Sequence, residues 1–262
     1  ACCYLESLRE SDLIQSLLDG RLQFEWACVR MVSDDPAKVL GKARPEHIVV
    51  TQLQEAIGNP AQEVELVSPY FVPAKTGVDI FAALVAQGVA VKVLTNSLVA
   101  TDVAAVHSGY GKRRKALLEA GVELYEMRPT HSKTRLEKRN EKRRRRGRLP
   151  GSSGTSLHAK TFSVDGRQVF VGSFNFDPRS ALLNTELGFV IESERLAKRI
   201  SASFMERVPQ LAYRVRLDAK GRLFWEERNG DTLVTYRREP QVGWVKRMIV
   251  RMLALLPLDA LL

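Results

Sequence analysis

Residues 157–175 read Leu-His-Ala-Lys-Thr-Phe-Ser-Val-Asp-Gly-Arg-Gln-Val-Phe-Val-Gly-Ser-Phe-Asn. Asp165-Gly166 separates two short apolar runs in this stretch and is a strong signal for a tight hairpin turn. The run at 169–171 is expected to form the return strand. The stretch therefore predicts two antiparallel strands that lie side by side.

Four polar side chains flank the expected hairpin. His158 and Lys160 are two residues apart, so in an extended strand they project from the same face, and the same holds for Ser173 and Asn175. The hairpin allows the two pairs to meet across one ladder. An imidazole, an ammonium group, a hydroxyl and a carboxamide would then converge, which suits an attacking nucleophile beside a clamp for phosphoryl oxygens.

Strand-like and helix-like segments alternate through the middle of the chain. Buried strands are expected from short apolar runs at 64–67, 89–94, 122–125 and 185–191. Helices are expected from apolar periods at 46–57, 77–87, 102–120 and 194–208. This alternation is typical of an α/β sandwich, so we expect a mixed, mostly parallel sheet with helices on its faces.

The order of these segments predicts three parts in the 262-residue chain. Residues 1–45, a helix period followed by a strand-like run, are expected to be a linker or the end of a preceding lobe. Residues 46–212 form the expected catalytic lobe, interrupted by a basic, polar loop at 129–156. Residues 213–262 are expected to add small β hairpins and a C-terminal amphipathic helix. Because the chain starts without Met, we also expect it to be a fragment of a longer protein.

The net charge of +10 is concentrated in one segment. Residues 131–150 contain ten Lys or Arg against two Glu, a net charge of +8. Such a segment fits a non-specific nucleic-acid patch, a solvated loop, or an anchor for anionic lipid headgroups. The three cysteines form neither a disulfide framework nor a metal-ligand spacing, which favours a reducing compartment.

The chain closes with an amphipathic helical period around 244–256, in which Trp244 leads an apolar side and Arg247 and Arg251 lie on the other. This composition suits a helix that lies in a membrane interface. A helix packed on the domain explains the same pattern. No apolar run in the chain is long and uncharged enough to span a bilayer.

The spacing of the hairpin residues resembles the HKD motif of the phospholipase D superfamily, His-x-Lys-x4-Asp followed by Gly-Ser-x-Asn. The matching residues are His158, Lys160, Asp165, Gly172, Ser173 and Asn175. The resemblance implies that His158 attacks the phosphodiester or protonates the leaving oxygen, and that Lys160, Ser173 and Asn175 hold the phosphoryl oxygens. Glu186 matches the family carboxylate that orients the histidine. Asp165 is also explained by its place in the turn.

The superfamily uses two such motifs in each active site, and no other histidine of this chain opens a complete His-x-Lys-x4-Asp motif. The resemblance therefore implies either an N-terminal lobe with a partner motif upstream of this chain, or a second copy of the chain in a homodimer.

Further stretches resemble one branch of the superfamily, the bacterial cardiolipin synthases, and within it the C type. They lie at 24–42, 68–73, 94–97, 100–107 and 117–125. The resemblance implies the C-terminal half of a phosphatidyltransferase that uses phosphatidylglycerol and possibly phosphatidylethanolamine, without metal or cofactor. It also implies a peripheral protein on the cytoplasmic side of the bacterial inner membrane.

Three other functions remain open at this level: a phosphodiesterase or nuclease acting as a homodimer, a phospholipase that transfers lipid to water, and a non-catalytic membrane-binding fragment.

Three residues outside the hairpin are candidates for substrate contact. Tyr70 and Phe71 follow an expected strand, and open α/β sheets bind ligands at the carboxyl ends of their strands. An ordinary buried aromatic pair is the alternative. His107 lies on the helix after the next strand, where it either faces substrate or packs in the domain.

Overall fold

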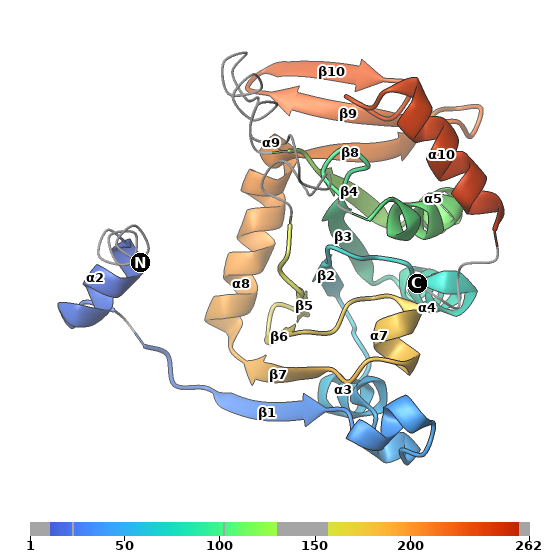
Figure 1. Ribbon diagram of the computed structural model, residues 1–262. Coiled ribbons are helices and arrows are strands. Elements are labelled where there is room, and N and C mark those ends of the chain that lie inside the picture. The colour runs from blue at the N-terminus through green and yellow to red at the C-terminus, as the bar shows by residue number, and fades with distance from the viewer. Residues whose placement is uncertain (1–10, 23, 102, 130–156, 257–262) are drawn as a thin grey trace, which may run out of the picture.

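The computed structural model describes residues 11–22, 24–101, 103–129 and 157–256, and the basic segment 131–150 lies outside them. The described residues form one ten-stranded sheet in the order β1-β7-β6-β5-β2-β3-β4-β8-β9-β10 (Figure 1). The strands are β1 (Cys28–Ser33), β2 (Glu63–Val67), β3 (Ala90–Asn96), β4 (Glu123–Met127), β5 (Thr161–Val164), β6 (Gln168–Gly172), β7 (Leu187–Glu192), β8 (Ala212–Leu217), β9 (Leu223–Asn229) and β10 (Thr232–Tyr236).

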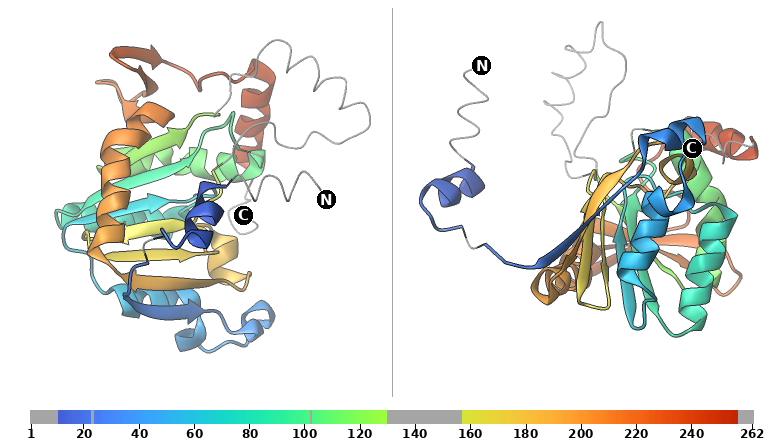
Figure 2. Two further views of the ribbon diagram at one scale, coloured as in Figure 1. Left: turned by 90° about the vertical axis from the view of Figure 1, so that its left-hand side faces the viewer. Right: turned by 90° about the horizontal axis from the view of Figure 1, so that it is seen from below.

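Helices cover both faces of this sheet (Figures 1 and 2). One face carries α8 (Glu194–Ala202), which packs on β5 and β6 and continues through a π-helical turn (Ser203–Arg207) into α9 (Val208–Leu211). The opposite side carries α3 (Val49–Ile57), α4 (Ala74–Ala86), α5 (Ala104–Glu119), α7 (Pro178–Leu182) and α10 (Trp244–Leu255). The expected α/β sandwich with helices on its faces is therefore confirmed.

The strand directions differ from the expectation of a mostly parallel sheet. Only β2, β3 and β4 pair in parallel among the described strands, and the other pairings are antiparallel. The mixed sheet is confirmed, but its mostly parallel character is wrong. Parallel neighbours need a crossover connection, which α4 supplies between β2 and β3 and α5 between β3 and β4. The antiparallel neighbours on either side, β5 and β8, come from distant segments of the chain, so no local connection fixes their direction.

Two segments outside the expected lobe belong to the same sheet. Strand β1 comes from the part that the sequence assigned to a preceding linker, and it pairs antiparallel with β7. Strand β8 pairs antiparallel with β4, so the C-terminal hairpins extend the sheet at its other edge. The helix α2 (Asp12–Leu18) precedes β1 and has no buried residue.

The main hydrophobic core lies between the sheet and the layer of α3, α4 and α5. Its largest fully buried side chains include Phe71 of the loop after β2, Tyr110 of α5, Phe170 of β6 and Tyr213 of β8. Phe162 and Phe170 stack across the β5–β6 hairpin with ring centroids 4.9 Å apart. The hairpin is therefore anchored in the core by its inward face. In the part of the chain that the structure describes, no helix is long and apolar enough to cross a membrane.

Candidate active site

The hairpin predicted from residues 157–175 is confirmed. Strands β5 and β6 pair antiparallel, and Asp165 and Gly166 join them with φ angles of 52° and 59°. Positive φ at both central positions is the type I′ turn, whose twist matches that of the flanking strands. Asp and Gly tolerate this conformation better than most residues, which explains why the sequence reports the turn so directly.

The two polar pairs flank the open end of this hairpin. His158 and Lys160 precede β5, Ser173 and Asn175 follow β6, and the Gly172 N–H donates to the Lys160 carbonyl at 3.2 Å. The structure thus brings the pairs to the same end of the sheet, although not as parts of the strands themselves. His158 is exposed to solvent there, and the side chain of Asn175 is buried.

Gly172 is required by a close approach of two strands. It lies directly opposite Gly188 of β7. A Cβ atom on Gly172 would lie 2.5 Å from the Leu187 carbonyl oxygen and 2.6 Å from the Phe170 ring. The absence of a side chain therefore allows β6 and β7 to close over Phe170, which in turn sets the position of Ser173.

Ser173 and Glu186 are joined by a hydrogen bond. The Ser173 hydroxyl donates to Glu186 Oε2, and the Leu187 N–H donates to Ser173 Oγ at 3.0 Å. Glu186 Oε1 accepts a hydrogen bond from Asn184 Nδ2 at 3.4 Å. The Glu186 side chain is buried, so its carboxylate is held at the site by polar partners on both oxygens.

The sequence did not reveal which residues hold the Glu186 backbone in place. Asp34 and Glu186 form two hydrogen bonds. The Asp34 N–H donates to the Glu186 backbone carbonyl, and the Glu186 N–H donates to the side-chain Oδ2 of Asp34, both at 2.9 Å. Lys38 Nζ lies 2.7 Å from the same carboxylate, and both side chains are almost fully buried. The Asp34–Lys38 ion pair thus supports the Glu186 segment from the N-terminal part of the chain.

No local signal identifies this pair, because Asp34, Asp35 and Pro36 read as an ordinary loop. Asp35 does cap the short 3-10 helix Pro36–Leu40 by accepting from the Ala37 N–H, which is the role that such residues normally have. Burial of Lys38 also depends on Ser180, which lies 142 residues further along the chain. The Lys38 ammonium group donates to the Ser180 carbonyl at 2.9 Å.

Lys160 carries the positive charge nearest the motif histidine in sequence, and its Nζ donates to the His158 carbonyl at 3.1 Å. Partial burial lowers the pKa of Lys160 below its usual range, and the charges of Glu186 and Asp177 oppose this shift without cancelling it. The ammonium group therefore faces a site that two carboxylates make favourable for a cation.

Asp165 lies at the other end of β5. Its carboxylate accepts hydrogen bonds from the N–H groups of Ala61, Gln62 and Glu63 at 2.7–3.0 Å. Burial raises the pKa of Asp165, but these donors outweigh it and hold the pKa below its usual value. About five residues of extended chain, roughly 16 Å, separate Asp165 from Lys160. Asp165 therefore ties the hairpin turn to the loop before β2.

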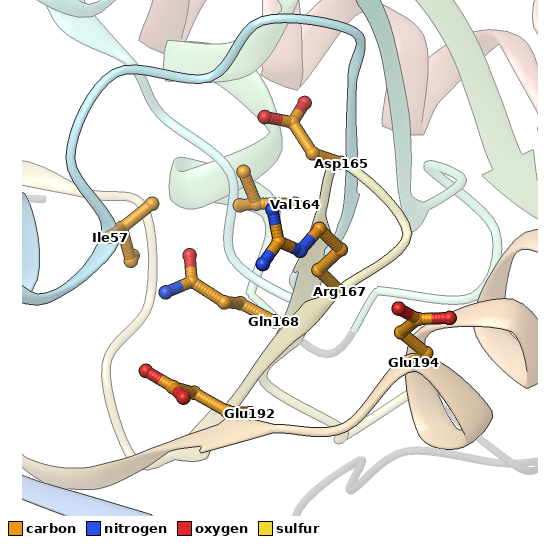
Figure 3. Close-up of a pocket in the computed structure, with 7 residues that line it drawn as sticks. All are labelled: Ile57, Val164, Asp165, Arg167, Gln168, Glu192 and Glu194. Atoms are coloured by element: carbon orange, nitrogen blue, oxygen red, sulfur yellow. The ribbon is translucent and has the colours of Figure 1, made fainter.

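A hollow of about 410 Å³ opens at this turn end of the hairpin (Figure 3). Arg167 and Gln168 line it together with Glu192 and Glu194. It is distinct from the open end of the hairpin, where His158 lies.

Of the three candidate substrate contacts, Phe71 and His107 lie in the core. Phe71 is fully buried with its ring centroid 5.8 Å from that of Phe81. His107 is almost fully buried, and its Nε2 lies 2.8 Å from Arg114 Nη2 and 3.3 Å from Glu239 Oε1. These contacts favour the packing alternative for both residues. Tyr70 is half-buried, and its carbonyl accepts a hydrogen bond from Ser68.

His107, Arg114 and Glu239 form a largely buried cluster in which the neighbouring groups shift the pKa of the carboxylate. Burial raises the pKa of Glu239, but the hydrogen bond from His107 and the charge of Arg114 outweigh it and lower the pKa to about 2. Arg114 also lies 3.0 Å from Glu126 and stacks over Tyr110. The cluster therefore joins α5 to β4 and to the loop that leads into α10.

The sheet topology and the hairpin constellation define a phospholipase D-like protein. The family model described as "Cardiolipin synthase, PLD-like domain" matches residues 53–208, so the chain belongs to this family. The resemblance to the phospholipase D superfamily and its cardiolipin synthase branch is thereby confirmed.

Relatives with known names agree with this assignment. The chain is 46% identical over 260 residues to cardiolipin synthase C of Escherichia coli K12, covering 99% of this chain and 53% of the relative. It is 27% identical over 161 residues to cardiolipin synthase A of Proteus mirabilis, covering 62% of this chain and 28% of that protein. The chain thus spans about half the length, or less, of these curated relatives.

Among solved structures, phosphatidylserine synthase of Haemophilus influenzae Rd KW20 superposes with a TM-score of 0.53 at 12% identity, covering 89% of this chain and 46% of that chain. This similarity supports the fold.

Proposed function

We propose that this chain is one lobe of a phosphatidyltransferase that makes cardiolipin through a phosphohistidine intermediate. The observation that carries the proposal is the convergence at one end of the β5–β6 hairpin of His158, Lys160, Ser173 and Asn175, with Glu186 hydrogen-bonded to Ser173. The match to the cardiolipin synthase family model and the 46% identity to cardiolipin synthase C support the choice of a phospholipid substrate.

In this scheme each chemical step exchanges one bond at phosphorus. A histidine nitrogen attacks the phosphorus of a donor lipid, the bond to its alcohol breaks, and the second histidine of the complete site protonates the leaving oxygen. A hydroxyl of phosphatidylglycerol then attacks the phosphohistidine, returns a proton to the second histidine and frees the first. His158 takes one of these two roles.

The other residues of the motif stabilise charge. Lys160 and Asn175 hold the non-bridging oxygens, where negative charge builds in the transition state, and Ser173 adds a hydrogen bond. In the scheme Glu186, which accepts from Ser173 and Asn184 in the structure, also serves during catalysis as the acceptor for the second nitrogen of His158, which sets the tautomer and steadies the imidazolium. Asp165 acts structurally at the turn. Because Lys160 and its counterpart supply positive charge, the scheme uses no metal or cofactor.

The remaining half of the site comes from another lobe with its own HKD motif. An apolar surface beside the site supports this: Met31, Val171, Leu187 and Phe189 are each between 41% and 59% exposed on one side of β1, β6 and β7. Met31 and Val171 are both register partners of Phe189, so the patch is continuous. Exposed apolar patches of this kind mark interaction sites, and the backbone N–H of Leu187 donates to Ser173 Oγ, so the patch begins at a residue beside the motif. We assign this surface to the N-terminal lobe of the full-length protein.

The proposed partners are phosphatidylglycerol as acceptor, phosphatidylglycerol or phosphatidylethanolamine as donor, and an anionic membrane surface. The corresponding location is peripheral, on the cytoplasmic side of the bacterial inner membrane.

Incubation of the full-length protein with vesicles tests the proposal. We expect cardiolipin, measured by mass spectrometry, from phosphatidylglycerol alone or with phosphatidylethanolamine. His158→Ala is expected to abolish turnover with unchanged circular dichroism, whereas His47→Ala, at a half-exposed histidine outside the site, retains it. Hydrolysis of DNA without cardiolipin synthesis would show instead a nuclease, and a single-lobed homodimer in solution would assign the partner motif to a second copy.

A further inference from the structure

Helix α10 leaves a wide apolar surface uncovered. Its packing on α5 and on the loop after β3 buries Val250, which clusters with Leu98 and Val242. The exposed fraction is between 48% and 86% for six other apolar side chains of the helix, namely Trp244, Val245, Met248, Ile249, Met252 and Leu255. The helix is thus fixed to the domain by one narrow side and exposes most of its apolar residues.

The exposed residues form one continuous arc. At about 100° per residue, positions 244, 255, 248, 252, 245 and 249 follow one another around the helix within roughly 140°. Arg251 and Arg247 border this arc on one side, and Lys246 lies beyond the other. Residues 244–255 contain no Asp or Glu, so the helix combines a Trp-led apolar face with basic edges.

We propose that this face of α10 inserts into the interface of an anionic phospholipid membrane and holds the lobe on it. An apolar arc flanked by Lys and Arg is the pattern of helices that lie in the plane of the membrane interface, where Trp is favoured at the headgroup level. The inference extends the proposed function. It depends on that function in one respect, which is that the substrate is a lipid.

Contacts within the domain connect α10 to the catalytic end of the sheet. Lys246 Nζ donates to the Leu98 carbonyl at 2.6 Å, and Leu98 lies two residues after Asn96, the last residue of β3. The Asn96 side chain is bonded to both the N–H and the carbonyl of Leu157, at 3.1 and 3.2 Å. Leu157 precedes His158, so a membrane bound by α10 lies at the edge of the sheet where the motif opens.

The charge of α10 argues against a second copy as the occupant of this face. Two copies meeting through α10 would bring the three cations of each helix together without a carboxylate on either helix. Anionic headgroups provide the complementary charge, and acyl chains receive the apolar arc.

A vesicle-binding assay on the full-length protein tests the proposal without any turnover. Sedimentation would compare vesicles of phosphatidylserine and phosphatidylcholine with vesicles of phosphatidylcholine alone, so that neither proposed substrate is present. We expect binding to the anionic vesicles to fall about tenfold or more in a Trp244→Ser, Met248→Ser, Met252→Ser variant. Arg251→Gln is expected to weaken it about fivefold, because one cation near such a surface contributes about 1 kcal/mol.

Matched controls lie on other parts of the surface. Met205→Ser removes an apolar side chain that is 74% exposed on the face of the sheet that carries α8, and Arg228→Gln removes an exposed cation from β9. Both variants are expected to bind as the unaltered protein does.

A spectroscopic readout locates the contact. Anionic vesicles are expected to shift the tryptophan emission of the full-length protein to shorter wavelength. We expect Trp244→Phe to remove that shift and Trp26→Phe, at an exposed position outside α10, to retain it. The proposal would be overturned if the triple variant bound anionic vesicles as well as the unaltered protein does. It would also be overturned if the triple substitution abolished self-association of the protein and left vesicle binding unchanged. Failure to make cardiolipin would not affect these measurements, so it would count against the proposed function alone.

Discussion

Replacing Lys38 by Met removes one member of the buried ion pair behind Glu186. The side chains of Lys38 and Asp34 are 3% and 0% exposed, with Nζ 2.7 Å from Asp34 Oδ2. In Lys38→Met, the Asp34 carboxylate keeps the N–H groups of Val49 and Glu186, at 2.7 and 2.9 Å, but faces no positive charge. Breaking such a pair costs about 3–5 kcal/mol of unfolding free energy.

For a domain of this size the cost corresponds to a fall in Tm of about 6 to 20 °C, measured by circular dichroism, with urea unfolding giving the free energy. We expect turnover to fall as well, because an Asp34 carboxylate without its cation is a weaker anchor for the Glu186 backbone than the ion-paired one. The double variant Asp34→Asn, Lys38→Met removes both charges of the pair and is expected to regain at least about 1 kcal/mol.

An exposed pair provides the matched control. Lys198 and Glu194 form an ion pair on α8 with side chains 70% and 65% exposed, so Lys198→Met is expected to change the unfolding free energy by about 0.5 kcal/mol or less. A loss below about 1 kcal/mol for Lys38→Met, or a double variant at least as unstable as the single one, would refute the reasoning.

Three further predictions follow from the geometry. Because burial lowers the pKa of Lys160, the apparent pKa of the alkaline limb of the pH–rate profile should lie below the usual lysine range, and Lys160→Arg should raise it. The same apparent pKa in both proteins would show that Lys160 is not the group that titrates in this limb. Gly172→Ala should cost about 1–3 kcal/mol in urea unfolding by forcing β6 and β7 apart, and no loss would contradict the close approach. Glu239, with its pKa lowered from 4.5 to about 2, should contribute stability above pH 4.5 that is lost as pH falls toward 2, up to about 3 kcal/mol; Glu239→Gln should flatten acid unfolding over that window.

The fold and the site were predictable where the signal is local. Asp165-Gly166 specifies a type I′ turn through its own backbone preferences, so the hairpin follows from adjacent residues. The relative direction of the paired strands was not predictable in the same way, because parallel and antiparallel strands can have the same apolar sequence pattern. The pairing of β1 with β7 depends on chain segments more than 150 residues apart.

Burial separated the candidates that the sequence had left together. Phe71 and His107 looked like possible substrate contacts because they follow strand ends, but packing against Phe81 and Arg114 places them in the interior. Lys38 belongs to a residue type that is mostly exposed, and the Asp34 carboxylate and a distant carbonyl make its burial possible.

The sequence by itself determined the hairpin, the motif residues and the family, because turn chemistry and motif spacing are written in neighbouring positions. Only the tertiary structure decided that Asp34 and Lys38 support Glu186, that Asp165 serves the turn, and that the apolar arc of α10 is exposed. These outcomes depend on which distant segments pack together. Burial and charge pairing are properties of that packing and have no counterpart in local sequence.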